Sequence, residues 1–352
     1  MTIAGIGFAL AGPTTVSAAV VHHCVSDAAQ FVSVLATTAG DGNTDFVFLA
    51  AGTYASPPTG FITTVQGSGD HLVIVGGYKV VAGNCVASTR PDPRLTRIDG
   101  AGVNPGMSIH GGTNGGVISV QNLTFVAGHR DQMPFQSGGA LAIDASNTFT
   151  GSILIDRVIF RDNVASGGGG ALSITPGSQT SSSTVRNSLF VGNSSDYGSA
   201  LAHGPLGLSK DLISNTFIGN SAATTIVGLA ATVVRTGTSW GFSNNIFWGN
   251  TTSDQFDIVT GEQENFAYND VERMMGTPHT AIGVPLTLSV DPGFRSASDF
   301  HLRLDSPLIN AGTTTPFGGI ANYDLDGLPR VVAGTVDYGA YGHDVILMEG
   351  FN

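Results

Sequence analysis

The sequence predicts an all-β protein built as a parallel solenoid, in which short strands recur coil after coil. One observation is a column of phenylalanines whose spacings are 35, 30, 27 and 30 residues. A second column of small residues runs in step with it, as GGALAI, GGGALSI, YGSALAH and VGLAATV. Two columns with one shared period of about 30 residues indicate a structural repeat. The phenylalanines are Phe125, Phe160, Phe190, Phe217 and Phe247.

The apolar runs within each unit have the length and composition of strands. They are short, rich in β-branched residues and separated by Gly, Asn and Ser, as in SILIDRVIFRDN. No unit contains a run of helical length with apolar residues three and four apart. We therefore expect each strand to pair with the equivalent strand of the next coil, about 4.8 Å away.

A third column predicts how the coils are held together. Three residues after each phenylalanine comes Gly128 and then, in the later units, an asparagine. Asparagine tolerates the left-handed conformation of a tight corner, and stacked side-chain amides form hydrogen-bonded ladders. We expect the phenylalanines to stack inside the solenoid and the asparagines to form a ladder at one corner. The ladder residues are Asn163, Asn193, Asn220 and Asn250.

The charge distribution narrows the range of partners. Charged residues make up 11% of the 352 residues, against about 25% in typical proteins, and the formal net charge is −12. Residues 117–250 are neutral, whereas 251–352 carry fourteen acids and four Arg, which gives −10. An acidic chain without a basic patch argues against binding to nucleic acid or to anionic membranes. A polyanionic sugar would need a metal ion to bind to such a surface.

The N-terminal residues predict an export segment followed by a cap. Residues 1–19 combine an apolar run with small residues suited to signal-peptidase cleavage, and the alternative is a first buried strand. No apolar run of 18 residues occurs elsewhere, so we expect no membrane span. Residues 26–38 are typical of a short helix capped by Ser26 or Asp27, which would cover the end of the solenoid. We place this cap and the first coils in residues 20–105.

Cys24 and Cys85 are the only cysteines. In an exported protein, two cysteines predict one disulfide, which would tie the cap to the segment after the strand that ends at Tyr78. The alternative is a pair of buried free thiols.

The F-x-x-N and G-G-A-L columns resemble those of secreted bacterial parallel β-helix proteins with the pectate-lyase-like fold, including polymorphic-outer-membrane-protein-like repeats. The segment GGYKVVAGNCVASTRPDPRLTRIDG (Gly76 to Gly100) is similar to a strand, Cys and turn found in the same proteins. The resemblance implies a right-handed parallel β-helix, which we place in residues 106–272. It also implies a monomer that is secreted or held at the outer surface of a bacterium.

Residues 273–352 resemble the choice-of-anchor Q type of C-terminal module in that group. The matching motifs are DPGF, SPLINAG, DLDGLPR and VDYGAY, although Gly342 replaces the usual Glu. The resemblance implies an acidic, β-rich module that closes the solenoid.

Catalytic groups on a solenoid would come from one outward column of neighbouring coils. Asp131 and Asp196 lie six residues after Phe125 and Phe190, and Ser166 has the same offset on the coil between them. Two coils would separate the carboxylates by roughly 10 Å, just beyond the distance used by inverting glycosidases. The other candidates are Arg161, His129 and His203.

These residues suit glycoside hydrolysis, or β-elimination with Arg as base. The alternative is that they are ordinary turn and surface residues. The resemblance supplies no catalytic set, because the polygalacturonase motifs and the acidic cluster of calcium-dependent pectate lyases are missing from the sequence.

Two further features allow a structural and a binding interpretation. Trp248 follows an interior phenylalanine and should point outward, either under the C-terminal module or, with Tyr197, as a platform for sugar rings. Asp324 and Asp326 form half of a calcium-loop pattern, and the alternative is a turn stabilised by its own Asp side chains. Calcium is the only cofactor that the sequence suggests.

The sequence thus predicts a secreted or surface β-helix protein without enzymatic activity that binds carbohydrate or a surface partner along its face. A polysaccharide lyase or glycoside hydrolase acting on an extracellular polysaccharide is the alternative.

Overall fold

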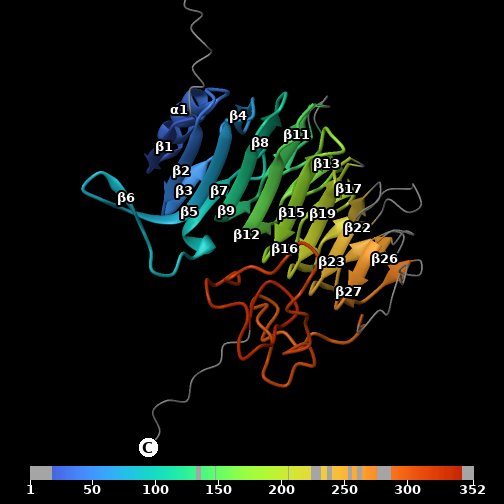
Figure 1. Ribbon diagram of the computed structural model, residues 1–352. Coiled ribbons are helices and arrows are strands. Elements are labelled where there is room, and N and C mark those ends of the chain that lie inside the picture. The colour runs from blue at the N-terminus through green and yellow to red at the C-terminus, as the bar shows by residue number, and fades with distance from the viewer. Residues whose placement is uncertain are drawn as a thin grey trace, which may run out of the picture.

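The computed structural model describes residues 18–131, 136–146, 148–204, 206–222, 231–235, 240–252, 256–259, 264–275 and 287–342. The chain forms a parallel β-helix with one short α-helix over its N-terminal end and a strand-poor module packed against one side (Figure 1). The predicted all-β solenoid is confirmed. The expected export segment lies outside the described residues except for its last two, Ala18 and Ala19.

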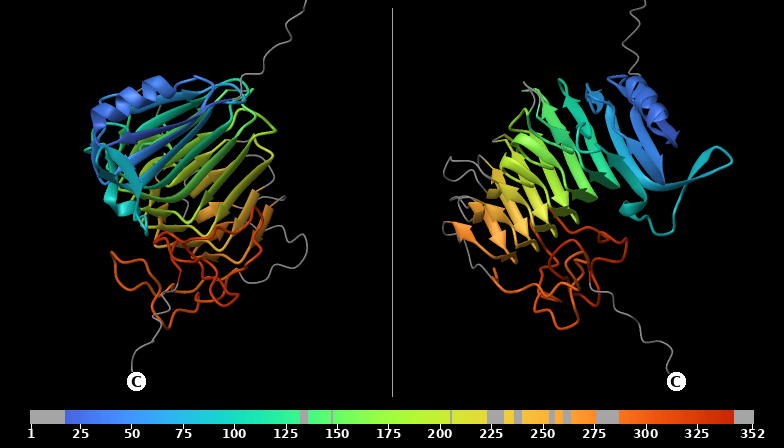
Figure 2. Two further views of the ribbon diagram at one scale, coloured as in Figure 1. Left: turned by 60° about the vertical axis from the view of Figure 1, so that its left-hand side comes forward. Right: turned by 180° about the vertical axis from the view of Figure 1, so that it is seen from behind.

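Three parallel sheets run along the solenoid, and the coils from β9 to β26 contribute to all of them (Figures 1 and 2). The 5-stranded sheet contains β10 (His129–Arg130), β13 (Val164–Gly168), β17 (Ser194–Tyr197), β21 (Ser221–Ala222) and β25 (Thr251–Thr252). The 8-stranded sheet contains β4 (Phe61–Val65), β8 (Met107–Gly111), β11 (Leu141–Ala145), β14 (Leu172–Thr175), β18 (Leu201–His203), β22 (Ala231–Arg235), β26 (Phe256–Val259) and β29 (Met274–Met275).

The 16-stranded sheet bends around a corner and therefore covers two faces of the solenoid. Its strands pair in parallel except for the hairpin of β5 and β6. They are β1 (Val20–Val25), β2 (Thr44–Ala50), β3 (Gly52–Ala55), β5 (His71–Val81), β6 (Asn84–Ala87), β7 (Thr96–Asp99), β9 (Val117–Val126), β12 (Ser152–Arg161), β15 (Ser182–Arg186), β16 (Leu189–Val191), β19 (Ser209–Ile213), β20 (Thr216–Ile218), β23 (Trp240–Ser243), β24 (Ile246–Trp248), β27 (Glu264–Ala267) and β28 (Asp270–Val271). A 3-10 turn, η1 (Pro93–Leu95), precedes β7.

The N-terminal helix α1 (Ala28–Thr38) closes one end of the core (Figure 2). Asp27 caps it by accepting a hydrogen bond from the Gln30 N–H at 2.8 Å. Phe31 and Leu35 are buried, and the Phe31 ring lies 4.6 Å from that of Phe61. The helix therefore covers apolar side chains that would otherwise meet solvent at the end of the solenoid.

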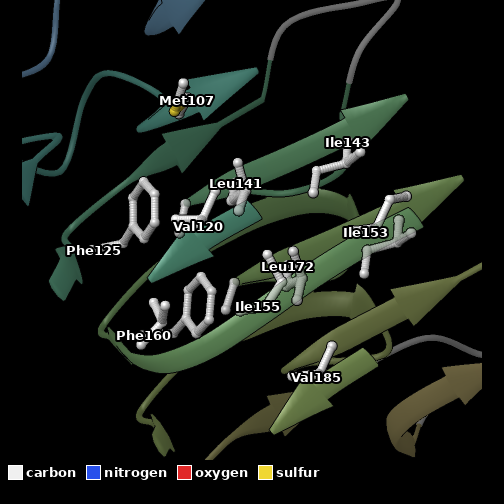
Figure 3. Close-up of a cluster of buried hydrophobic side chains, with 14 of the residues drawn as sticks. Met107, Val120, Phe125, Leu141, Ile143, Ile153, Ile155, Phe160, Leu172 and Val185 are labelled. Atoms are coloured by element: carbon white, nitrogen blue, oxygen red, sulfur yellow. The ribbon is translucent and has the colours of Figure 1, made fainter. Parts of the chain in front are cut away.

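The phenylalanine column forms a continuous stack inside the β-helix. Successive ring centroids, from Phe125 to Phe247, are 5.5, 4.7, 4.7 and 4.5 Å apart, with interplanar angles of 14° or less. Figure 3 shows the rings of Phe125 and Phe160 one above the other, beside the aliphatic side chains from the facing strands. This register follows from the pairing of β9, β12, β16, β20 and β24 at these positions.

The asparagine column forms a buried hydrogen-bonded ladder. Asn163 donates its backbone N–H and its side-chain Nδ2 to Oδ1 of Asn193, at 3.0 and 2.9 Å, and the pattern continues through Asn220 to Asn250. The asparagines do not themselves adopt the left-handed conformation, contrary to the expectation from the sequence. The residue before each of them does, for example Asp162 (φ +54) and Gly192 (φ +67), which frees the amide to reach the next coil.

A second ladder stands at the corner where the 16-stranded sheet bends. Asn215 donates from its backbone N–H and from Nδ2 to Oδ1 of Asn245, which makes the same pair of bonds to Asn269. The residue before each of these asparagines again has positive φ, as in Ser214 (+56°) and Asn244 (+60°). In the sequence this signal stands two residues before Phe217 and Phe247, as Asn215 and Asn245, but not before the earlier phenylalanines.

The disulfide predicted between Cys24 and Cys85 is present, with a Cα–Cα distance of 5.2 Å. Cys24 belongs to β1, the first strand of the sheet, and Cys85 to the hairpin strand β6. The bond therefore fixes the protruding hairpin against the N-terminal edge of the β-helix.

Residues 287–342 lie along the side of the solenoid (Figure 1). Their regular structure consists of isolated bridges, such as Phe294 with Leu302 and Tyr323 with Pro329, in place of the strands expected of a β-rich module. Polar turns and two small apolar clusters hold the segment together. The first cluster contains Ile159, Leu189, Phe300, Leu325, Ala340 and Tyr341, and the second contains Ile246, Leu302, Leu308 and Tyr338.

Candidate functional site

A groove of about 860 Å³ lies on the outer face of the 8-stranded sheet. It extends over several coils, because β8, β11, β14 and β18 all contribute to its floor. Its polar lining residues include His110, His129, Asp131, Gln136, Ser137, Asp144, Ser173, Thr175 and Tyr197.

Strand alternation decides which side chains reach the groove. In β11, Leu141 and Ile143 are buried in the core, whereas Ala142 and Asp144 point outward. Parallel register places Asp144 next to His110 on one side and Thr175 on the other. The floor therefore carries a row of polar side chains, one per coil, about 4.8 Å apart.

His129 and Asp131 contact each other and form one wall of the groove. Nε2 of His129 lies 3.5 Å from Oδ2 of Asp131, and both side chains are partly exposed. Arg130 between them also lines the groove but is buried, and it donates to the Gly138 carbonyl at 3.0 Å and to Oγ of Ser108 at 2.9 Å. Burial lowers the pKa of its guanidinium. Arg130 thus ties the wall to the sheet, and its guanidinium is largely buried at the side of the groove.

Tyr197 contributes an aromatic ring to the groove. The ring lies directly over Gly168, because a Cβ atom at that position would be 2.0 Å from Cε2 of Tyr197. Glycine at position 168 is therefore required for the ring to lie flat against the neighbouring coil. Pro58, Ile62, Val103 and Pro105 form an apolar rim, in which Ile62 and Val103 are 48% and 69% exposed.

The other proposed catalytic residues are not all brought into this groove. β13 and β17 pair Val164 with Ser194 and Ala165 with Ser195, but the register then shifts before Gly168 pairs with Tyr197, so Asp196 lies at an irregularity of the predicted column. Asp196 is exposed but is not among the residues that line the groove. Arg161 lines a separate cleft of about 400 Å³, between the solenoid and the C-terminal module.

His203 is among the residues around the groove, but its side chain points into the core. It pairs in register with Ile174, an interior residue, and its side chain is 5% exposed. Nε2 lies 2.7 Å from Oγ of Ser183, Nδ1 lies 2.8 Å from the Gly204 carbonyl, and the ring packs edge-on against Trp240. Burial lowers the pKa of His203 to about 4, so that it is neutral at physiological pH and acts as a hydrogen-bonded core residue.

Asp324 and Asp326 stabilise a turn and an inter-segment contact. Asp324 is fully buried and accepts hydrogen bonds from the N–H groups of Asp326, Leu328 and Gly342. Asp326 accepts from Nη2 of Arg94 at 2.7 Å and lies 2.5 Å from Nε2 of His301. These partners account for the conformation of both side chains, as the turn interpretation expects. Burial raises the pKa of Asp324, and the His301 hydrogen bond helps to lower that of Asp326 against the opposing effect of burial.

Trp248 lies under the C-terminal module. It packs against the apolar cluster that contains Leu302, Leu308 and Tyr338. The outward column of which it is part is covered, so this tryptophan is not an open platform for a sugar ring.

The groove was not located from the sequence. His110 and Asp144 belong to no sequence motif, and they come together only through the register of β8 and β11.

Within the part of the chain that the structure describes, no helix has the length and hydrophobicity needed to cross a membrane. A scan against models of protein families gave no match to the chain, and a search of curated proteins found no relative.

Proposed function

We propose that this is a secreted or cell-surface β-helix protein that binds a carbohydrate chain in the groove over the 8-stranded sheet, without transforming it. The observation that carries the proposal is the length of the groove along the coils together with its lining. Binding sites for small molecules and sugars combine apolar surface with a few oriented polar groups. Here the exposed rim at Ile62 and Val103 supplies the apolar part, and the row of His110, Asp144 and Thr175 supplies the polar part.

The charge of the groove favours a neutral polysaccharide. The buried Arg130 donates to Gly138 and Ser108, and the partly exposed His129 contacts Asp131. Asp144 adds a further negative charge on the floor. A polyanionic sugar would be repelled by these carboxylates, whereas hydroxyl groups can donate to them.

The test is a binding panel with the purified full chain. Isothermal titration calorimetry and affinity electrophoresis would compare neutral glucans, xylans and mannans with polygalacturonate. We expect binding to at least one neutral polymer, with a loss of tenfold or more in Tyr197→Ala or Asp144→Ala. Tyr323→Ala is the matched control, because Tyr323 is an exposed tyrosine of the C-terminal module. Binding that is unaffected by both groove variants, or that is restricted to polygalacturonate, would contradict the proposal.

The His129–Asp131 pair is the one observation that favours the enzymatic alternative, a polysaccharide lyase or glycoside hydrolase. A carboxylate beside an imidazole and near a tyrosine supplies groups for acid–base chemistry in the same groove. Turnover would be followed by ultraviolet absorbance for elimination products and by reducing ends for hydrolysis. Activity that is lost in Asp131→Asn but kept in Asp196→Asn would establish the enzyme and replace the binding function.

A further inference from the structure

Three carboxylates from different turns meet at the N-terminal end of the β-helix, away from the groove. One oxygen from each of Asp41, Asp45 and Asp70 lies within 4.8 Å of one from each of the others. Asp45 and Asp70 are each 1% exposed, whereas Asp41 is exposed. A deep acidic pair with one acidic residue at its mouth resembles the inner and outer ligands of a cation site.

Strand register explains why these residues meet. Thr44 at the start of β2 pairs with His71 at the start of β5, and the His71 N–H donates to the Asn43 carbonyl at 2.8 Å. The turns that precede the two strands are therefore neighbours. The first turn carries Asp41 and leads into Asp45, and the second carries Asp70.

Each carboxylate is already held in place by one neighbour. Oδ1 of Asp45 lies 2.7 Å from Nε2 of His23, and Asp70 accepts a hydrogen bond from the Gln66 N–H. Asp41 accepts from the N–H of Asn43 at 2.8 Å and from its side-chain Nδ2 at 2.9 Å. Hydrogen bonds of this kind orient ligating carboxylates in metal sites.

The second carboxylate oxygen of Asp45 gives the strongest support for a bound cation. Oδ2 is buried and makes no hydrogen bond to the described residues, although a buried carboxylate oxygen normally has a partner. Asp45 also faces Asp41 and Asp70, and no Lys or Arg of the described residues forms a salt bridge with any of the three. Burial raises the pKa of both Asp45 and Asp70, and the neighbouring Asp41 raises both further.

We propose that Asp41, Asp45 and Asp70 bind a calcium ion. The donors are all oxygens, which hard divalent cations prefer, and their irregular arrangement suits the flexible coordination of Ca²⁺ better than the near-ideal octahedron that Mg²⁺ requires. Solvent reaches the site beside the exposed Asp41 and would supply the remaining ligands as water.

The bound ion would join the turn that follows α1 to the turn that precedes β5. It would thereby fix the cap helix on the first coils. This role is structural and independent of carbohydrate binding in the groove.

The test uses the full chain, freed of metal with EDTA and dialysed, and titrated calorimetrically with CaCl₂ or MgCl₂. We expect Ca²⁺ to bind more tightly than Mg²⁺ and to raise the melting temperature. Asp45→Asn should abolish both effects, and Asp41→Asn should weaken Ca²⁺ binding by at least 10-fold. Asp41 is exposed, so its variant tests binding without disturbing the core.

Two controls test whether Ca²⁺ binding depends on these three carboxylates and not on acidic side chains elsewhere, including the turn that contains Asp326. Asp305→Asn removes an exposed carboxylate, and Asp326→Asn removes the one near His301; both should keep Ca²⁺ binding. Without metal, Asp45→Asn should melt no lower than the parent protein, because it removes a buried charge. The absence of Ca²⁺ binding at millimolar concentration would overturn the proposal. So would tighter binding of Mg²⁺, or Ca²⁺ binding retained in both Asp41→Asn and Asp45→Asn.

Discussion

Replacing Asp270 with Asn should stabilise the protein at neutral pH, although it alters a fully buried residue. Asp270 lies in β28, at the junction between the last coil and the C-terminal module, and is 0% exposed. Its Oδ1 accepts a hydrogen bond from the Val290 N–H at 3.0 Å, but its Oδ2 is buried with no partner among the described residues. Burial, with the nearby Asp291 and Glu272, raises the pKa of Asp270 to about 7.

The expected gain in stability follows from the difference in the pKa of Asp270 between the folded and the unfolded state. An unfolded Asp ionises near pH 4, whereas folded Asp270 keeps its proton up to about pH 7. Between these values the folded state binds more protons, so the free energy of unfolding falls as pH rises. A difference of about 3 pKa units corresponds to about 4 kcal/mol, at 1.36 kcal/mol per unit. Asn keeps the acceptor for Val290 and cannot ionise, so Asp270→Asn should escape this loss.

The assay is denaturation by guanidinium chloride, followed by circular dichroism at pH 4, 5.5, 7 and 8. We expect nearly equal stabilities at pH 4 and an advantage for Asp270→Asn that grows to about 4 kcal/mol above pH 7. Hydrogen exchange should show the added protection in residues 287–342. Asp305→Asn, at an exposed carboxylate, is the control and should show no such trend. A variant that is less stable than the parent at pH 8, or an advantage independent of pH, would refute the reasoning.

The remaining predictions concern the repeat and its N-terminal edge. Phe190→Ala should lower the free energy of unfolding by about 3–5 kcal/mol in denaturant titrations, because it leaves a cavity in the ring stack, and an equal effect from an exposed Phe would contradict this. Asn193→Ala removes the acceptor for Asn163 and the donor to Asn220, and should lower the free energy of unfolding by about 2–4 kcal/mol. Amide exchange should become faster in both neighbouring coils, and an effect confined to its own coil would contradict the ladder. The double variant Cys24→Ser/Cys85→Ser should have a free energy of unfolding about 4 kcal/mol below that of the oxidised parent, because the disulfide closes a loop of 61 residues. A reduced parent that is as stable as the oxidised parent would contradict that value.

The architecture could be predicted because the fold repeats the same local rule in each coil. Phe160 pairs with Phe190 of the next coil, and Asn163 bonds to Asn193 in the same way. Residues that recur at one spacing in the sequence therefore stack in the structure. The second ladder was harder to predict, because asparagine stands two residues before Phe217 and Phe247 only, and Ser188 has this position in the unit before them.

The candidate sites were less accessible from the sequence because they depend on orientation and register. His203 stands where the three preceding coils place Ile109, Ile143 and Ile174, and only its pairing with Ile174 shows that it points inward. Arg161 shares the offset of Trp248, so both face the C-terminal module and not the groove. The acidic group at Asp45 and Asp70 has no sequence motif, because two separate turns bring it together.

The C-terminal module changes how the solenoid should come apart. In a simple repeat protein each coil contacts only its neighbours, so unfolding can begin at an end and proceed one coil at a time. Here the module touches several coils at once, through Ile159, Leu189 and Ile246. Through Asp326 it also reaches Arg94, 232 residues earlier in the chain. Fraying of one coil would therefore loosen contacts to distant ones, and we expect the coils under the module to unfold as one cooperative unit.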